Sequence, residues 1–294
     1  MTDPVPPKRV FQPAREEAET AAQATQSAQT MDPAYRLAFQ DMDFLLREDL
    51  RPVRFQLELL KPELLLDEAK IASTFVFYGS ARIPEPDKAD ALIASAATDG
   101  QRAIAERLKA KSKYYDESRK LARMVSRVDP DAEGRRHFVV CSGGGPSIME
   151  AANRGAVDEG KESVGLNIVL PHEQLPNPYV TPRLSFQFHY FALRKMHFLL
   201  RARAIAVFPG GFGTFDEAFE LLTLIQTGKV KPIPILFFGR EFWERVIDFE
   251  ALADEGVISP DDLKLFTYCE TAEEAWACVC RYYAETGEDP RCDL

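Results

Sequence analysis

A glycine-rich turn followed by two carboxylates is the segment of this sequence best suited to chemistry. An apolar run ends at Pro209, and a turn and a helical pattern follow it. The turn-forming residues are Gly210, Gly211, Gly213 and Thr214. Glycine has no Cβ, so backbone N–H groups can approach a phosphate, and the N-terminus of the next helix adds partial positive charge. Asp216 and Glu217 come within one further helical turn, so a candidate anion site lies beside candidate acid–base groups.

Two other apolar runs end in small residues in the same way. One run begins at residue 73 and the other at residue 136. The small residues that end them are Gly79 and Ser80 in the first, and Gly143, Gly144 and Gly145 in the second. A single glycine turn is as often only a tight strand-to-helix turn as a ligand site. Three such turns at one edge of a sheet favour a nucleotide-like phosphate ligand, because parallel sheets bind ligands beyond the carboxyl ends of their strands.

The familiar nucleotide-binding motifs do not fit these turns. The P-loop pattern G-x-x-x-x-G-K-[ST] does not occur, and G-x-G-x-x-G is missing after the first apolar run. An ATPase or an ordinary dehydrogenase is therefore disfavoured. No cluster of His and Cys has the spacing of a metal site, so we expect neither a metal ion nor a cofactor.

The two carboxylates also have a purely structural interpretation. The stretch from Thr214 to Glu217 matches a capping box, in which the Glu217 side chain would bond back to the backbone N–H of Thr214. Asp216 would then respond only to the positive end of the helix dipole. The sequence leaves the catalytic and the capping interpretations of Glu217 both open.

A helical pattern over residues 188–201 places Arg194, His197 and Arg201 on a common face. Such a face is usually a solvated basic surface. The helix leads directly into the strand before the glycine turn, however, so an arginine on it is also a candidate to point toward the same pocket.

Strand-like apolar runs alternate with helical patterns from residue 73 onward. Strands are expected within 73–82, at the start of 136–156, and within 163–171, 203–211, 231–239 and 265–269. Helices are expected at 110–127, 147–159, 188–201, 214–227, 241–252 and 271–285. Continuous apolar strands separated by amphipathic helices are typical of a parallel sheet covered on both faces. We therefore expect an α/β fold with a doubly wound, Rossmann-like parallel sheet and helical N-terminal and C-terminal additions.

Three parts of the chain are expected. Residues 1–30 are rich in Pro, Ala, Glu, Gln and Thr, which predicts a mobile tail. Residues 31–70 have helical spacing and predict a helical N-terminal extension. Residues 71–294 are predicted to form the Rossmann-like nucleotide-binding catalytic domain, with 83–110 as a partly helical insertion.

Composition narrows the class of protein. The 294 residues are 46% hydrophobic and 28% charged, as in an ordinary soluble globular protein. A net charge of −10 argues against a general nucleic-acid or anionic-membrane surface. The five cysteines are scattered, the start lacks the apolar core of a signal peptide, and no later run reaches membrane length. We expect a cytoplasmic protein that binds neither nucleic acid nor membrane.

Several of these motifs together resemble the LOG family, the cytokinin riboside 5′-monophosphate phosphoribohydrolases, which are often mislabelled as lysine decarboxylases. The family motif P-G-G-x-G-T-x-x-E is matched from Pro209 to Glu217, and LRKMHF, CSGGGPSIMEAANRGA and FYGSAR occur upstream in order. The resemblance covers about residues 70–270. The helical N-terminal segment and the length resemble the longer bacterial branch, in which higher oligomers such as hexamers occur. The first turn, Tyr78-Gly79-Ser80-Ala81, departs from the Cys-Gly-Ser-Ser of many relatives.

The resemblance implies a hydrolase that cleaves the N-glycosidic bond of a nucleoside 5′-monophosphate. AMP or N6-modified, cytokinin-type AMP would give free base and ribose 5-phosphate. Arg194 and Glu217 match the catalytic residues of the family, and Gly211, Gly213 and Thr214 match its phosphate loop. The resemblance also implies a homo-oligomer, a dimer or a hexamer.

Physical chemistry agrees with these roles. Glycosidic cleavage passes through an oxocarbenium-like ribose, which an ionised carboxylate stabilises while it orients or deprotonates the attacking water. Arg194 has three candidate roles: holding the phosphate, holding the ribose hydroxyls, or helping the purine to leave.

A lysine decarboxylase would need a Schiff-base lysine in a pyridoxal phosphate site, and the sequence identifies none. The alternative is a non-catalytic protein of the same fold that holds a nucleotide or a molybdopterin-type cofactor. The presence of both Arg194 and Glu217 favours the enzyme.

Overall fold

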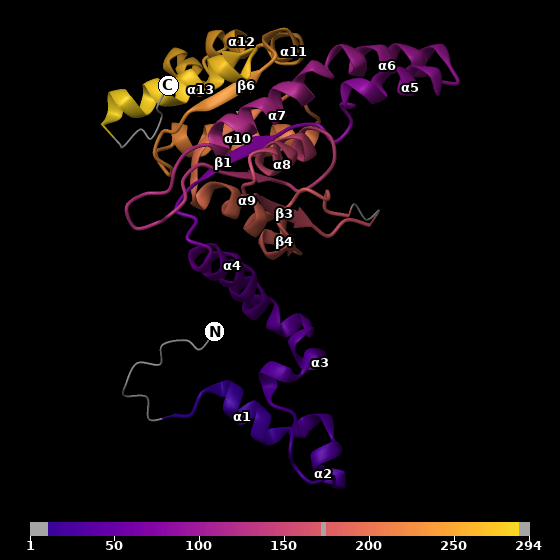
Figure 1. Cartoon of the computed structure of the whole chain (residues 1–294), viewed down its shortest axis with the longest axis vertical. Coiled ribbons are helices and arrows are strands. Elements are labelled where there is room, and N and C mark those ends of the chain that lie inside the picture. Colours follow the sequence, from indigo (N-terminus) through magenta and orange to yellow (C-terminus); the bar gives the residue numbers. More distant parts are fainter. Residues whose placement is uncertain (1–10, 172–174, 288–294) are drawn as a thin grey trace. The chain divides into compact units, whose positions relative to one another are not determined.

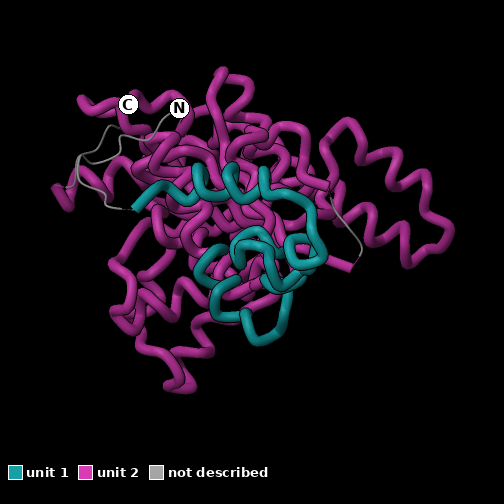
Figure 2. The backbone as a smooth tube through the Cα atoms, turned by 90° about the horizontal axis from the view of Figure 1, so that it is seen from below, with its two compact units in different colours: residues 1–57 teal, residues 58–294 magenta. Residues whose placement is uncertain are grey.

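The computed structural model describes residues 11–171 and 175–287. The chain divides into two compact units, residues 1–57 and residues 58–294 (Figure 2). None of the described helices combines the length and the apolar character needed to span a membrane.

A seven-stranded parallel sheet forms the centre of the second unit (Figure 1). The strands are β1 (Thr74–Tyr78), β2 (Val139–Ser142), β3 (Val164–Ile168), β4 (Ser185–Phe188), β5 (Ala202–Val207), β6 (Ile235–Phe238) and β7 (Thr267–Cys269). Their order is β4-β3-β2-β1-β5-β6-β7, so the order reverses between β1 and β5. Val76 of β1 pairs with Cys141 on one side and with Ile205 on the other. The predicted doubly wound, Rossmann-like parallel sheet is confirmed.

The edge strand β4 is the element that the sequence pattern missed. Residue 188 was expected to begin a helix, yet Phe188 ends β4 and pairs with Ile168 of β3. The strand has only four residues, in which buried Phe186 and Phe188 alternate with more exposed neighbours. So short an alternation is easily read as the first turn of the amphipathic helix that follows it.

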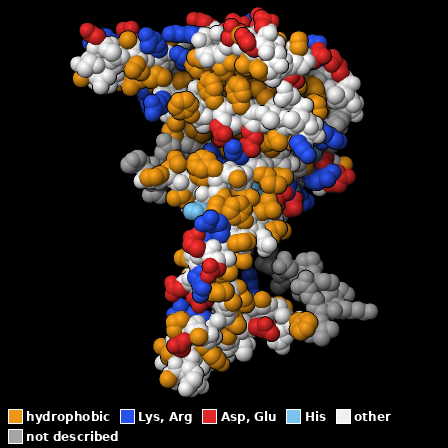
Figure 3. Space-filling view, turned by 180° about the vertical axis from the view of Figure 1, so that it is seen from behind, with side chains coloured by type: hydrophobic (Ala, Val, Ile, Leu, Met, Phe, Trp, Pro, Cys, Tyr) orange, Lys and Arg blue, Asp and Glu red, His pale blue; other side chains and the backbone are white. Residues whose placement is uncertain are grey.

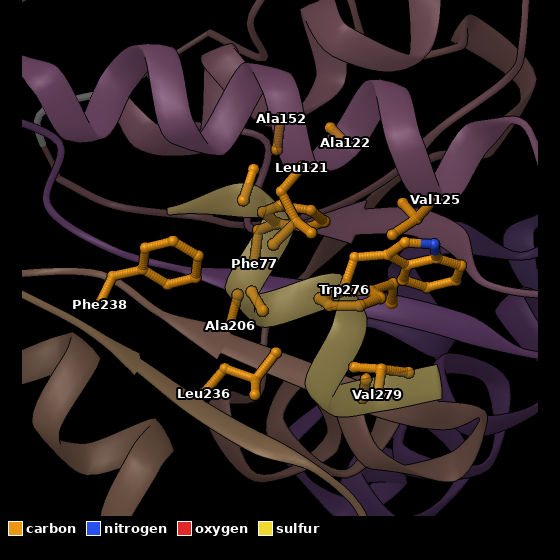
Figure 4. Close-up of a cluster of buried hydrophobic side chains, with 14 of the residues drawn as sticks. Phe77, Leu121, Ala122, Val125, Ala152, Ala206, Leu236, Phe238, Trp276 and Val279 are labelled. Atoms are coloured by element: carbon orange, nitrogen blue, oxygen red, sulfur yellow. The ribbon is translucent and has the colours of Figure 1, made fainter. Parts of the chain in front are cut away.

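One face of the sheet is covered by α7 (Lys113–Ser126), α8 (Ile148–Asp158) and α13 (Ala272–Thr286). Their apolar side chains pack with alternate strand residues into one buried cluster, which contains Phe77 of β1, Leu121 of α7 and Trp276 of α13 (Figure 4). The short, continuous apolar strands of the sequence are explained by this burial on both faces.

The helices of the other face are α9 (Phe191–Leu200), α10 (Phe212–Gln226), α11 (Arg240–Val246) and α12 (Phe249–Asp254). Tyr78 of β1 points to this side, where its ring centroid lies 5.1 Å from that of Phe198 in α9. Phe237 of β6 meets Trp243 of α11 at 4.7 Å. The long helix α10 therefore lies on the sheet beside α9, and its N-terminus follows directly from the end of β5.

The insertion expected at residues 83–110 is a helical hairpin. Helices α5 (Pro86–Ala94) and α6 (Asp99–Ala110) lie side by side and extend from the body of the second unit (Figure 1). Lys109 near the end of α6 contacts Asp90 of α5 at 2.5 Å. The hairpin leads into α7, so its two ends return to the main sheet.

The first unit is built from short helices. They are α1 (Ala14–Ala21), α2 (Ala28–Met31), α3 (Met42–Leu45) and the start of α4 (Arg51–Glu68). Short 3-10 turns lie at Pro33–Tyr35, Ala38–Gln40 and Glu48–Leu50 here, and at Pro182–Leu184 and Pro260–Lys264 in the second unit. None of the side chains of α1, α2 or α3 is buried.

These boundaries differ from the expected ones. Residues 1–10 of the expected tail lie outside the described residues, whereas residues 11–30 contain α1 and α2. Good helix formers in α1 and the capping box of Ser27 explain the two helices. The units divide at residue 57 rather than 70, because the end of α4 belongs to the second unit. There Leu66 is buried, and Glu58 accepts a hydrogen bond from the backbone N–H of His189 at 2.8 Å.

Surface charges are mixed in sign. On the face shown in Figure 3, acidic and basic side chains lie close to one another among hydrophobic ones. Ion pairs such as Arg119 with Asp158 at 2.5 Å are part of this pattern. On this face, therefore, charges of opposite sign are interspersed.

Candidate active site

A cavity of about 770 Å³ opens where β1 and β5 end. Its volume is within the range of about 300–1,000 Å³ that is typical of ligand sites. The residues that line it come from both strand ends and from the helices around them, and they include Gly79, Ser80, Arg82, Leu108, Lys111, Met149, Arg194, Gly210, Gly211, Phe212, Gly213, Thr214, Phe215, Glu217 and Phe242. The cavity lies at the reversal of strand order, where doubly wound sheets bind their ligands.

The turn after β5 is open to this cavity. Helix α10 begins at Phe212 with Gly211 as its N-cap, and no side chain caps its N-terminus. A Cβ added to Gly211 or Gly213 would meet no atom within 4 Å. The first N–H groups of α10, at residues 212–214, have no acceptor among the described residues, so they are free to bind an anion.

The capping-box interpretation of Thr214 and Glu217 is wrong. The helix starts three residues earlier than that interpretation requires, so Thr214 already lies inside α10. The buried side chain of Thr214 occupies the space beside Gly210. A Cβ on Gly210 would lie only 2.1 Å from Thr214 Oγ1. Gly210 therefore permits the tight turn, and Glu217 is left without a capping role.

Glu217 and Arg194 face each other at the side of the cavity. Glu217 Oε1 lies 3.6 Å from Arg194 Nη1, and the two side chains are 14% and 11% exposed. Arg194 Nε donates a hydrogen bond to the carbonyl of Leu166 at 2.7 Å, and its guanidinium lies 5.1 Å from the ring of Phe198. The sheet and α9 thus hold the arginine in place and direct it toward the carboxylate.

Burial determines the electrostatics of Glu217. Loss of solvent raises the pKa of its carboxyl to about 7, while the nearby Arg194 guanidinium lowers it in part. We expected an ionised carboxylate, and a pKa this close to neutral makes both the ionised and the protonated forms of Glu217 accessible there. Burial also raises the pKa of its neighbours Tyr78 and Cys141 above their ordinary values, so both stay neutral.

Asp216 has a different environment from its neighbour in sequence. Its side chain is 56% exposed and pairs with Lys195 at 3.2 Å. Lys195 also contacts Glu220 at 3.2 Å, and hydrogen bonds to both carboxylates raise the pKa of its ammonium against the effect of burial. Asp216 therefore belongs to a surface ion-pair group, whereas Glu217 faces the cavity.

The turn after β1 supports the same cavity. Gly79 and Ser80 both line it. The N–H of Ser80 donates to the carbonyl of Pro209 at 3.1 Å, which ties this turn to the one after β5. A Cβ on Gly79 would lie 2.6 Å from Ile148 of α8, so the glycine allows α8 to pack closely against the strand end.

The turn after β2 is closed, in contrast to the expectation. Gly143, Gly144 and Gly145 are not among the residues that line the cavity. A Cβ on Gly144 would lie 2.3 Å from Asn167, and Asn177 binds the carbonyls of Gly144 and Gly145. Gly143 has an indirect link to the site, since a Cβ there would lie 2.6 Å from Arg194 Nη2. These glycines form a packed junction behind the cavity wall.

His197 and Arg201 do not join the site. His197 is buried, with Nε2 3.1 Å from the carbonyl of Glu58, and burial lowers the pKa of its ring. Arg201 pairs with Glu63 at 3.1 Å and with Asp67 at 2.8 Å. This face of α9 therefore packs on α4 rather than forming a solvated basic surface, and Arg194 alone of the three lines the cavity.

Sequence reasoning missed part of the cavity wall. Arg82, Leu108 and Lys111 come from the ends of the α5–α6 hairpin, and Phe242 comes from α11. Arg82 ends the motif FYGSAR, although no role followed from it, and no motif marks the other three, which reach the cavity only through the folding of distant segments. Within the described part of the chain, no group of three or more His, Cys, Asp or Glu residues is arranged to hold a metal ion.

Known proteins share this combination of sequence features. Residues 149–279 match the family described as possible lysine decarboxylase. The chain is 26% identical over 139 residues to cytokinin riboside 5′-monophosphate phosphoribohydrolase LOG3 of Arabidopsis thaliana, covering 46% of this chain and 63% of LOG3. It is 28% identical over 140 residues to the enzyme of the same activity named LOG in Oryza sativa subsp. japonica, covering 46% and 56% of the two chains.

The resemblance to the LOG family is confirmed. The aligned region spans less than two thirds of the length of these two LOG relatives. Among solved structures, the Moco carrier protein from Chlamydomonas reinhardtii is similar, with a TM-score of 0.42 and 16% identity over 72% of this chain and 99% of that one.

Proposed function

We propose that this chain is a hydrolase that cleaves the N-glycosidic bond of nucleoside 5′-monophosphates. The substrate would be AMP or an N6-modified, cytokinin-type AMP, and the products would be free base and ribose 5-phosphate. The observation that carries the proposal is the buried Glu217 carboxylate, 3.6 Å from Arg194, in a cavity that also contains an uncapped helix N-terminus. The similarity to LOG relatives of that activity supports it.

The phosphate of the substrate would require hydrogen-bond donors and positive charge, and the ribose would require a carboxylate. The site contains both kinds of group. The dianionic phosphate would bind the free N–H groups at the start of α10, where Gly211 and Gly213 leave the backbone open. The ribose would then lie toward Glu217, about one helical turn further along α10. The positive charge that develops at C1′ would be stabilised by the ionised carboxylate.

Glu217 is suited to act on water as well. A general base is most effective when its pKa is near the working pH, and the Glu217 pKa of about 7 meets that condition. The oxygen of water would add to C1′ and its proton would pass to Glu217. The bond from C1′ to the base nitrogen would break with its electron pair going to the base, which then takes up a proton to become the free base. Arg194 would orient Glu217 and stabilise negative charge on the phosphate or the departing base.

Base release tests the proposal. Purified protein is incubated with AMP, GMP, CMP, UMP and isopentenyl-AMP, and free base and ribose 5-phosphate are followed by chromatography. We expect release with at least one purine nucleotide, reduced about 10²–10⁴-fold in Glu217→Gln. Asp216→Asn is the matched control, because its exposed carboxylate lies beside Glu217 in sequence but pairs with Lys195, and it should retain activity within about 3-fold. Tight AMP binding without release would instead favour the nucleotide or molybdopterin-type carrier.

The pH dependence gives a second readout. Since only ionised Glu217 can act as the base, kcat/KM should rise through about pH 7 and reach a plateau above it. A profile that falls through the same pH would mean that protonated Glu217 acts as an acid, and it would contradict the proposed role.

We also propose that the protein works as a cytoplasmic homo-oligomer, a dimer or a hexamer. The likeness to the longer bacterial branch is the basis for this proposal. Light scattering coupled to gel filtration tests it, and a monomer at micromolar concentration would contradict it.

A further inference from the structure

The cavity reaches both sides of the N-terminal end of α10. Glu217 and Phe215 both line it, although they are two residues apart on the helix and therefore point about 200° apart. Glu217 lies on the side of Arg194 and Tyr78. Phe215 lies on the side of α11, with its ring 5.4 Å from that of Trp243. A phosphate on the start of α10 would thus have the proposed ribose site on one side and further cavity on the other.

The second side is lined by the ends of the α5–α6 hairpin. Arg82 comes before α5, Lys111 directly follows α6, and both line the cavity. Lys111 Nζ donates to the carbonyl of Arg107 at 3.0 Å and lies 5.9 Å from the ring of Phe242. This carbonyl bond and the ring fix the ammonium at the wall with donors left for a ligand.

The cations on this side have no direct carboxylate partner among the described residues. In the described ranges, neither Lys111 nor Arg82 forms an ion pair with an acidic side chain, in a protein whose net charge is −10. Arg107 and Arg245 lie near Lys111 as well. Burial, followed by these two cations, lowers the pKa of Lys111, and Glu241 opposes them. A cationic wall in an acidic protein is complementary to an anionic ligand group.

A single phosphate would have partners without this charge. A 5′-monophosphate on α10 would be met by the helix N-terminus, with Arg194 on the ribose side. Arg82 and Lys111 would then remain for a second anionic group attached to the first.

We propose that Arg82 and Lys111 form a subsite for a phosphate beyond the 5′-phosphate, so that the cavity accepts nucleoside 5′-diphosphates. The inference rests on the proposed function for the position of the first phosphate. It makes the α5–α6 hairpin a specificity element, because both cations stand at its ends. The distal phosphate would lie between the start of α10 and the wall formed by Lys111 and Phe242.

Equilibrium binding tests this subsite. Calorimetric titrations with ADP, AMP and adenosine are made on Glu217→Gln protein, so that turnover does not consume the ligand. We expect ADP to bind about 10-fold more tightly than AMP, because a second charged contact is gained. Adding Lys111→Ala should remove that advantage and leave AMP affinity within about 2-fold, while Lys111→Arg should keep it.

Lys113→Ala is the matched control for the lysine substitution. Lys113 is exposed, pairs with Glu270 at 3.5 Å and does not line the cavity. It should change neither affinity. Retained AMP binding in Lys111→Ala shows that the variant is folded.

Two results would overturn the subsite: ADP binding no tighter than AMP, or Lys111→Ala weakening ADP and AMP by the same factor. Failure of the proposed function is seen separately, as absence of base release from AMP by the wild-type protein. An ADP preference that depends on Lys111 would still support the subsite in that case.

Discussion

The glycine turns after β2 and β5 have the same sequence signature and opposite surroundings. Each follows a buried strand and leads into a helix of the Rossmann-like sheet. After β5, Gly211 and Gly213 are exposed, and a Cβ on either would meet nothing within 4 Å. After β2, Gly144 is buried at φ +70°, and its missing Cβ makes room for Asn167.

A polar network explains the closed turn. Ser142 donates to Asn153 at 2.8 Å and accepts from the N–H of Gly144 at 3.0 Å. Asn177 donates to Asn153 at 2.9 Å and to the carbonyl of Gly145 at 3.0 Å. The N–H of Gly144 and the carbonyls of Gly144 and Gly145 are thus already used by the protein. A glycine in such a turn therefore predicts that another group lies close to the backbone. The neighbouring side chains determine whether that group is a ligand or part of the protein.

The largest effect that we expect in this comparison is at Gly144. An alanine there would adopt a left-handed conformation and overlap Asn167, so Gly144→Ala should lower the free energy of unfolding by about 2–3 kcal/mol. Urea unfolding followed by circular dichroism measures it. A stability within about 0.5 kcal/mol of wild type would mean that the turn after β2 is not a packed junction.

Most of the fold could be predicted because burial on both faces leaves a strong local pattern. The apolar runs that became β1, β2 and β6 are continuous and buried, those of β3 and β5 are buried over most of their length, and glycines mark the ends of several of them. The edge strand β4 could not be found in the same way. Its pairing with β3 is a non-local contact, and its four residues carry no turn signal of their own.

Site residues that lie within one sequence motif could be predicted. Site residues that come together only when distant segments fold could not. Glu217 and the phosphate turn share one contiguous motif, and Arg194 lies on the helix just before it. Lys111 and Phe242 are 131 positions apart in the chain and meet only because the hairpin and α11 both return to the cavity at the start of α10. The same limit explains why the sequence could not decide between capping and catalysis for Glu217, since the answer depends on where α10 begins.

Gly143 should show that the closed turn still positions a functional group. A Cβ there would lie 2.6 Å from Arg194 Nη2 and 3.0 Å from Met149 Sδ, and both atoms can move aside at the ends of flexible side chains. Gly143→Ala should therefore lower kcat/KM about 10–100-fold with little change in stability. Kinetics with AMP and a thermal melt on the same preparation separate the two effects. A destabilised variant of unchanged activity would place Gly143 with Gly144 as a packing residue only.

We expect Gly213→Ala to affect the free energy of unfolding in the opposite way to Gly144→Ala. It lies in the first turn of α10 with open space around it, so Gly213→Ala should keep or slightly raise the free energy of unfolding. The added methyl would project toward the proposed phosphate position and weaken AMP binding about 10-fold. Calorimetry and urea unfolding check the two parts, and unchanged affinity would remove the turn after β5 from the phosphate site.

The burial of Glu217 beside the open turn should lower the stability of the folded protein, in contrast to the closed turn. The closed turn satisfies its polar groups internally, whereas α10 carries a buried carboxyl whose pKa is raised from 4.5 to about 7, mainly by burial. Below about pH 4.5 the carboxyl is protonated in both the folded and the unfolded chain, and it costs nothing. As pH rises from about 4.5 to about 7, the carboxyl ionises in the unfolded chain before it ionises in the folded one, so the folded wild type loses stability over this range. Glu217→Gln stays neutral, and it should exceed wild type by about 1 kcal/mol in free energy of unfolding at about pH 8 and match it at about pH 4. Urea unfolding at both pH values measures the difference. A destabilised variant at about pH 8 would mean that the pairing with Arg194 outweighs the burial of the charge, and that the open turn carries no such cost.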